Sequence, residues 1–186
     1  MGSEPSDEEL MLRYGKGDAG AFEALYRRHR LPLYGFLLRQ VGNKDTAEEL
    51  FQDLWMRVVN FRGRYEVRAK FTSWVYAIAH NRLMDFYRAN GRASFLGHEE
   101  SESVLEDLPA VEIAADLRLD RKRAMERLFA ALTELPGAQR EAFLLQQEGE
   151  MSIEDIAQAT GVSRETAKSR LRYAVAKLRS SLGRES

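Results

Sequence analysis

The sequence predicts an all-α protein of two small helical domains joined by an acidic flexible linker, with a helix-turn-helix in the C-terminal domain. Three observations lead to this prediction. Apolar residues recur at helical spacing through most of the 186 residues. The four prolines and thirteen glycines fall mostly between these periodic segments. Charge is also segregated, because two basic stretches flank an acidic one.

Composition narrows the classes of protein that fit. A hydrophobic content of 44% allows a packed core. The absence of cysteine excludes disulfides and thiolate metal sites, and the three histidines (His29, His80 and His98) are too scattered to suggest a metal cage. We therefore expect no metal and no other cofactor. The acidic N-terminus lacks a secretory leader and no apolar run reaches the length of a membrane span, so we expect a cytoplasmic protein without membrane insertion.

The first domain, residues 1–92, begins with helices that Asp7 or Asp18 can cap, and Pro32 is expected to bend or interrupt the segment that follows. Asn43 and Asp45 offer the next helix start, ahead of an apolar stripe that predicts a core-facing helix. The outer face of this helix is polar. It is either a solubilising surface or an acidic contact for a basic partner, and it comprises Glu48, Glu49, Gln52, Asp53 and Arg57.

Residues 61–70 contain a glycine, four cations and no stable apolar period, which predicts a loop. A helix is expected to follow over residues 71–88. Its inward side is predicted to hold Phe71, Trp74, Val75, Ile78, Leu83 and Phe86, and its opposite face Ser73, Tyr76, Ala77, His80, Asn81, Met84 and Arg88. Aromatic and amide groups interleaved with cations suit an unpaired nucleic-acid strand, although Trp74 alone is more typical of core packing.

Residues 93–119 form the predicted linker. From Phe95 to Asp120 there are eight acidic residues against Arg118 alone, whereas Arg57 to Arg92 holds eight Lys or Arg residues against two acids. The acidity is compatible with simple solvation, and equally with a segment that mimics a nucleic-acid strand in a basic channel. The remaining domain, residues 120–186, is expected to hold four helices, the first ending at Pro136 and Gly137.

The last two of these helices form the predicted helix-turn-helix. Ser152 and Asp155 can make a capping box, and Gly161 supplies the left-handed turn before Ser163 caps the second helix. That helix has one apolar stripe and otherwise basic faces, with seven cations and one acid from Ser163 to Arg184. A cationic helix of this kind suits the major groove of DNA, and the less specific alternative is a solvated surface helix.

Four segments in this order carry a resemblance to a known family: DTAEELFQDLWMRVV, FTSWVYAIAHNRLMDFYR, LPGAQREAFLL and MSIEDIAQATGVSRETAKSRL. Together they resemble the extracytoplasmic-function sigma factors, a two-domain class of bacterial transcription initiation subunits. The resemblance covers almost the whole chain. It implies a protein without catalytic chemistry whose partners are core RNA polymerase, promoter DNA as duplex and as unpaired non-template strand, and commonly an anti-sigma factor.

The resemblance also implies roles for individual residues. Glu48, Glu49, Gln52 and Asp53 fall on the polymerase-clamp contact, and the linker falls where the family threads the RNA exit path. The implied DNA-binding residues for the minus-ten element are Arg62, Arg64, Lys70, Trp74, Asn81 and Arg88. Those implied for the minus-thirty-five element are Arg164, Thr166, Lys168, Ser169, Arg170 and Arg172.

The chain departs from the family pattern at several positions. Tyr173 and Val175 replace common arginines, Glu150 stands where glycine is common, and the loop at 63–70 is longer and more basic. Two other functions are compatible with parts of the sequence. One is a free-standing regulator that uses only the helix-turn-helix; the other is a helical enzyme built on Glu48, Glu49 and Asp53, which lack any accompanying nucleophile, histidine cluster or phosphate loop.

Overall fold

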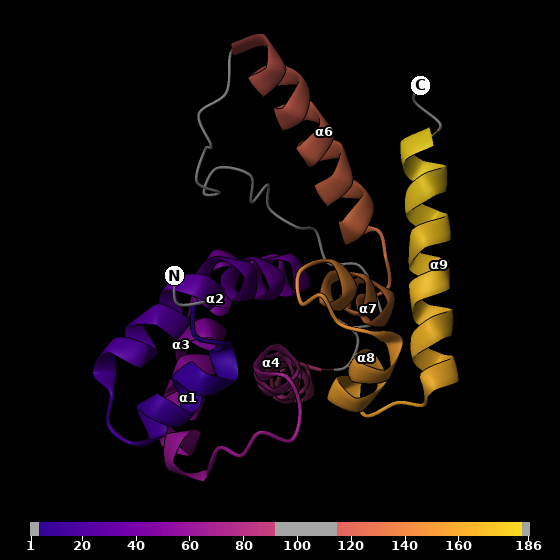
Figure 1. Cartoon of the computed structure of the whole chain (residues 1–186). Helices are drawn as coiled ribbons and strands as arrows, with labels where there is room; N and C mark the ends of the chain where they lie inside the picture. The colour runs from indigo at the N-terminus through magenta and orange to yellow at the C-terminus, as the bar shows by residue number, and fades with distance from the viewer. Residues whose placement is uncertain (1–3, 92–114, 184–186) are drawn as a thin grey trace.

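The computed structural model describes residues 4–91 and 115–183, with the backbone alone for 115–120. Secondary structure in these ranges is entirely helical, as predicted (Figure 1). The elements are α1 (Asp7–Gly15), α2 (Ala19–Val41), α3 (Lys44–Phe61), the 3-10 turn η1 (Arg62–Arg64), α4 (Phe71–Ala89), α6 (Ala115–Thr133), α7 (Gly137–Gln147), α8 (Ile153–Thr160) and α9 (Arg164–Gly183). The predicted linker up to residue 114 and the cation Arg184 lie outside the described residues.

Polar side chains fix the starts of the N-terminal helices. Ser6 and Glu9 form a capping box on α1, in which the Ser6 hydroxyl accepts from the Glu9 amide and the Glu9 carboxylate accepts from the Ser6 amide. Asp18 caps α2 through the Ala21 amide, and Asn43 caps α3. Asp7 is not a cap. It lies in the first turn of α1 and binds His29 of α2, which joins the two helices.

Pro32 was expected to bend or interrupt this segment, and the interruption is wrong, because α2 runs unbroken from Ala19 to Val41. On both sides of the proline, α2 buries apolar residues such as Leu25 and Phe36 in the core. This packing outweighs the loss of one backbone hydrogen bond at Pro32. The helix therefore spans the N-terminal domain as a single element, against which α1, α3 and α4 pack.

The C-terminal domain is a four-helix body in which α9 contacts α6, α7 and α8. Helix α6 begins at Ala115, five residues before the expected start at Asp120. In Figure 1, α6 and α9 extend together beyond the rest of the molecule. The apolar stripe predicted for α9 is inward at Ala167, Leu171, Ala174 and Leu178. No helix in the described ranges has the length and hydrophobicity needed to cross a membrane.

The two domains pack against each other, with α4 against α8 and α2 against α7 (Figure 1). Their contact includes two acidic residues, one on α7 and one in the turn that follows α7. Glu141 lies 2.7 Å from His80 of α4, and Glu148 pairs with Arg39 of α2. Arg140 also donates to the Arg39 carbonyl oxygen at 3.0 Å. Sequence periodicity identified both bodies but contained no information on how they meet.

Candidate nucleic-acid interface

The helix-turn-helix has the local structure that its sequence predicts. The Ser152 hydroxyl accepts from the Asp155 amide at 3.1 Å, and the Asp155 carboxylate accepts from the Ser152 amide at the same distance. Gly161 ends α8 with φ at 66°, a left-handed conformation that glycine adopts without steric cost. Ser163 then caps α9 through the Thr166 amide. This short joint turns the chain sharply into α9, the candidate recognition helix.

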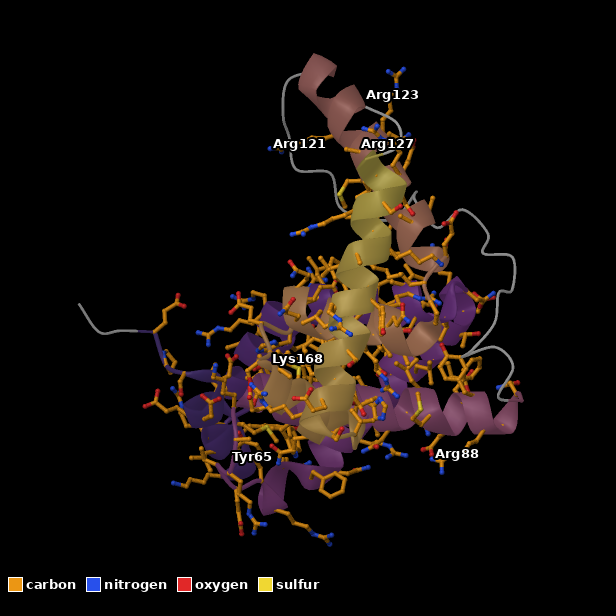
Figure 2. The ribbon with its side chains drawn as sticks, turned by 90° about the vertical axis from the view of Figure 1, so that its right-hand side faces the viewer. Tyr65, Arg88, Arg121, Arg123, Arg127 and Lys168 are labelled. Carbon is orange, nitrogen blue, oxygen red and sulfur yellow. The ribbon has the colours of Figure 1, made fainter. Side chains whose placement is uncertain are left out.

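The residues of α9 that are predicted to bind DNA fall into two groups. Lys168 and Arg172 are exposed, whereas Ser169 and Arg170 are half-buried. Arg164 forms an ion pair with Glu154 of α8, and the Thr166 hydroxyl bonds to that of Ser163 at 2.9 Å. In the N-terminal half of α9, the free positive charge therefore rests chiefly on Lys168 and Arg172, and Lys177 and Arg179 are exposed further along the helix. Figure 2 shows Lys168 on the face of α9 turned toward the viewer.

The two family departures on α9 have different environments. Val175 is half-buried. Tyr173 is 54% exposed, and the Arg172 guanidinium lies 5.1 Å from the centre of its ring. A cation held over an aromatic face loses conformational freedom. Tyr173 thus orients the exposed Arg172 and adds an aromatic surface to the recognition helix.

The loop between α3 and α4 exposes most of its predicted cations. Arg64 and Lys70 are exposed, while Arg62 lies over the Tyr14 ring at 5.6 Å and donates to the Val59 carbonyl. Arg68 pairs with Glu66 within the loop. The ring of Tyr65 anchors the segment, because it packs edge-on against Trp74 with centroids 5.0 Å apart. Burial raises the pKa of Tyr65 to about 12, so the phenol stays neutral.

Helix α4 presents a smaller polar face than its sequence predicts. Asn81 is exposed, and Arg88 is exposed with an ion pair to Asp85. Trp74 is half-buried, so both its packing and its binding interpretations remain compatible with its position. The expected exposure of Ser73, Tyr76 and His80 is wrong, because all three side chains are buried. The cause is tertiary. Ser73 lies beside α8 and His80 lies 2.7 Å from Glu141 of α7, whereas Tyr76 packs edge-on against Phe36 of α2 in its own domain.

Loop 61–70 and α8 border a groove of about 500 Å³. Its walls include Arg64, Tyr65 and Trp74 on one side and Gln158 on the other. In Figure 2, Tyr65 and Arg88 lie on the N-terminal elements at either side of α9. The groove is lined by rings and by charges of both signs, since Glu66 and Asp155 border it as well as Arg64 and Arg68. Its rings and cations are suitable chemistry for a nucleic-acid base and its phosphate.

The four residues of the predicted polymerase contact on α3 differ in their exposure. Glu48, Glu49 and Gln52 point from α3 with exposed side chains. Asp53 is half-buried and pairs with Arg82 of α4. Three members of the set are therefore free to bind another protein, and the fourth also joins two helices of its own domain.

Sequence reasoning missed a cationic group on α6. Arg121, Lys122, Arg123 and Arg127 are all exposed, and Figure 2 shows the labelled arginines around the outer end of the helix. The signal was present as a run of cations directly after the acidic linker, but it was read only as the start of a helix. Within the described ranges, no three acidic or histidine side chains are grouped as metal ligands.

Comparison with known proteins finds matches for both helical bodies. The Sigma-70 region 2 family model matches residues 25–93, and the Sigma-70 region 4 model matches residues 125–178. The RNA polymerase sigma factor CarQ of Myxococcus xanthus is 33% identical, over 93% of this chain and 95% of its own length. The ECF RNA polymerase sigma factor SigK of Mycolicibacterium vanbaalenii is 28% identical, over 95% of this chain and 89% of its own.

A similar solved structure is that of the sigma factor RpoE in complex with the anti-sigma factor NepR from Bartonella quintana. It matches with a TM-score of 0.69 and 25% identity, over 89% of this chain and 98% of that one. The likeness therefore extends across both helical bodies.

Proposed function

This chain belongs to the extracytoplasmic-function RNA polymerase sigma factors, and from that premise we propose which of its surfaces perform each part of the work. A sigma factor is a transcription initiation factor that binds core RNA polymerase, directs it to promoters through the minus-thirty-five and minus-ten elements, and helps to melt the DNA. The observation that carries the proposal is that two exposed basic surfaces lie on separate bodies, one on α9 and one on the loop before α4.

The C-terminal body, residues 120–186 together with the first turn of α6 from Ala115, reads the minus-thirty-five element as duplex. Lys168 and Arg172 supply phosphate contacts from exposed positions, and Thr166, Ser169 and Arg170 lie on the same N-terminal half of α9. Arg164 is held by Glu154 and so contributes to orientation more than to free charge. Phosphate contacts of this kind position the helix, and side chains directed at base edges provide sequence preference.

The N-terminal body, residues 1–92, reads the minus-ten element and holds the unpaired non-template strand. Arg62, Arg64 and Lys70 offer cations for its phosphates. The Trp74 and Tyr65 rings form an aromatic wall for a base, and the exposed Asn81 amide can hydrogen-bond to a base edge. Arg88 lies at the far end of the same helix, where Asp85 holds it.

Core polymerase binds to α3 through Glu48, Glu49 and Gln52, with Asp53 at the edge of the contact. These side chains form an acidic and amide surface on one helix, which suits a basic partner surface. We assign the protein no catalytic reaction: the free energy of binding opens the duplex, and no cofactor takes part. Its partners belong in the cytoplasm, and we propose the same location for this chain.

A second chain is also proposed as a regulator. RpoE, whose structure resembles this one across both bodies, was solved in complex with an anti-sigma factor. The free-standing regulator is disfavoured, because the region 2 match accounts for the N-terminal body as a sigma domain rather than a sensor.

Reconstituted transcription tests the proposal. Purified chain, core RNA polymerase and a promoter mapped from transcript starts after overexpression should yield a run-off transcript of defined length. Core polymerase alone on the same template is the control. Binding to duplex DNA without any core-dependent transcript would favour the regulator instead.

A further inference from the structure

The C-terminal domain covers part of the side of α4 that would contact the unpaired DNA strand in the proposed function. Ser73 and His80 are each 8% exposed, although they share the polar side of α4 with the exposed Asn81. Ser73 and Ala77 line the same groove as Gln158 and Ala159 of α8. The helix that would hold an unpaired strand is therefore packed against the helix-turn-helix.

Polar contacts hold the two bodies in this arrangement. His80 Nδ1 lies 2.7 Å from Glu141 Oε1, and the Glu141 side chain is 1% exposed. Arg39 of α2 and Glu148 form a second ion pair, with each side chain 18% exposed. Arg140 donates at 3.0 Å to the Arg39 carbonyl, so α7 and the turn after it contact both α2 and α4. Removing one partner of such a buried pair destabilises the contact strongly, because the other polar group then stays buried without a partner.

The arrangement is incompatible with simultaneous reading of both promoter elements. The elements are separated by about 25 base pairs, or about 85 Å of duplex at the axial rise of DNA. In the structure, α4 and α8 are in direct contact. The surfaces on α4 and α9 cannot reach both elements until the domains separate.

We propose that this sigma factor closes on itself, and that α7 and α8 dock on the strand-reading face of α4 as an autoinhibitory contact. The proposal rests on the proposed function of that face. Closure leaves Glu49 on α3 and Lys168 on α9 exposed. The closed chain thus retains its surfaces for polymerase and duplex DNA, and it lacks only access to the melted strand.

The closed contact is also built to open. Four buried polar atoms near it have no hydrogen-bond partner among the described residues: Ser73 Oγ, Tyr76 Oη, Glu141 Oε2 and Glu148 Oε2. Burial raises the pKa of Glu148 despite the opposing effect of Arg39, which shows that the carboxylate loses hydration in the closed form. Separation returns these groups to water, where they gain hydrogen bonds, and this favours the open form.

Thiol reactivity tests closure directly, because the native chain contains no cysteine. Ser73→Cys places one thiol in the covered face, and Met56→Cys places one at a 57% exposed position on α3 as the reference. Maleimide should label the Ser73→Cys protein at least about tenfold more slowly than the Met56→Cys protein, because protection follows the fraction of open molecules. Equal labelling rates would overturn the proposal.

A charge swap identifies the contact responsible. In the Ser73→Cys background, Glu148→Arg opposes Arg39 and should raise the labelling rate, and the Arg39→Glu/Glu148→Arg double variant should restore protection. Glu23→Arg, which alters an exposed pair with Arg27 on α2, is the matched control and should change nothing. Restored protection in the swap shows that the two charges act on each other, and an unchanged helical circular dichroism spectrum of the single variant shows that it opened rather than unfolded. An unchanged rate in Glu148→Arg, or no restoration in the swap, would overturn the role of this pair.

The outcome is independent of the transcription test. A protected Ser73→Cys thiol in a protein that supports no core-dependent transcript would leave closure standing and remove the sigma function. An unprotected thiol in an active sigma factor would do the reverse.

Discussion

The Asp53 carboxylate on α3 accepts a hydrogen bond from the Arg82 guanidinium on α4. Arg82 is only 19% exposed, and it also donates to Asp85 at 3.3 Å. Asp53 therefore holds two helices of the N-terminal domain together, whereas Glu48, Glu49 and Gln52 extend into solvent from the same helix. Residues that are adjacent in a motif thus separate into a structural and a binding group.

Substitution at Asp53 and Glu49 should have different effects. Asp53→Asn weakens a half-buried ion pair, and we expect the free energy of unfolding to fall by about 1 kcal/mol. Glu49→Gln removes an exposed charge, so unfolding should change by less than about 0.5 kcal/mol while affinity for core polymerase decreases. Urea unfolding and a fluorescence titration with core enzyme measure the two quantities. Equal stability of Asp53→Asn and the parent would contradict the structural role.

The backbone at Glu150 predicts a stabilising substitution. Glu150 is the non-glycine residue with positive φ among those described, at 49°, and it lies between α7 and the helix-turn-helix. A side chain in this left-handed region costs about 1 kcal/mol, which glycine avoids. Glu150→Gly should raise the free energy of unfolding by up to about 1 kcal/mol, less the added entropy of the unfolded chain. Glu150→Ala retains the strain and is the control, so an equal gain in both variants would assign the effect to charge instead.

Stability should depend on pH through Asp7. Its hydrogen bond to His29 and its contacts with Arg28 hold the pKa of the Asp7 carboxyl below the usual 3.8, against the opposing effect of burial. A lowered pKa in the folded state contributes stability above pH 3.8, and this contribution is lost as the pH falls through the folded value. Asp7→Asn should therefore be less stable than the parent by about 1 kcal/mol at pH 7.

The difference between Asp7→Asn and the parent should shrink as the pH falls below 3.8, where the parent carboxyl also becomes protonated. Urea unfolding at pH 7 and near pH 3 measures it, and Asp45→Asn, on the exposed first turn of α3, serves as the control. A difference that stays constant across this range would show that Asp7 acts through packing and not through its charge.

Local sequence signals predicted the elements of this fold well. The capping box of Ser152 and Asp155 and the left-handed turn at Gly161 involve residues within a few positions of one another, so their geometry follows from the sequence itself. The uninterrupted helix through Pro32 was not predicted, because packing of α2 against three other helices decides it.

The candidate site was predictable in composition but not in accessibility. Helical periodicity correctly grouped Ser73, His80 and Asn81 on one polar side of α4, yet only Asn81 is exposed. His80 contacts Glu141, which lies 61 residues away in the sequence, and no pattern in either helix predicts this pair. Contacts between domains depend on the shape of both surfaces at once.

The recognition helix should show its phosphate contacts in the salt dependence of DNA binding. Lys168→Ala and Arg172→Ala each remove an exposed cation from α9. We expect each variant to bind minus-thirty-five duplex more weakly and to flatten the log–log salt slope by about 0.9, the value for one lost phosphate contact. Arg27→Ala, which removes a 73% exposed cation from α2, is the matched control. Slopes that equal the parent's in both α9 variants would show that this side of the helix faces away from DNA.

Asn81 provides the sharpest test of strand reading, because its amide is exposed on α4 beside the covered His80. Asn81→Ala removes hydrogen-bonding groups but no charge, so binding of holoenzyme to closed duplex should remain unchanged. Open complexes hold an unpaired base that the amide would contact, and loss of one such bond should reduce their population about fivefold. Permanganate reactivity of unpaired thymines measures opening, and a filter-binding assay of the closed complex measures duplex affinity.

Asn60→Ala is the control for Asn81→Ala, since it removes the same amide group from an exposed position on α3. A fall in permanganate reactivity without loss of closed binding separates melting from docking, because the variant has the same charge and the same α9 surface as the parent. Undiminished melting in Asn81→Ala would mean that the unpaired strand does not contact this amide. The strand-reading surface would then be confined to the loop at 61–70 and the Trp74 wall, and domain separation would expose the rest of α4 for some other partner.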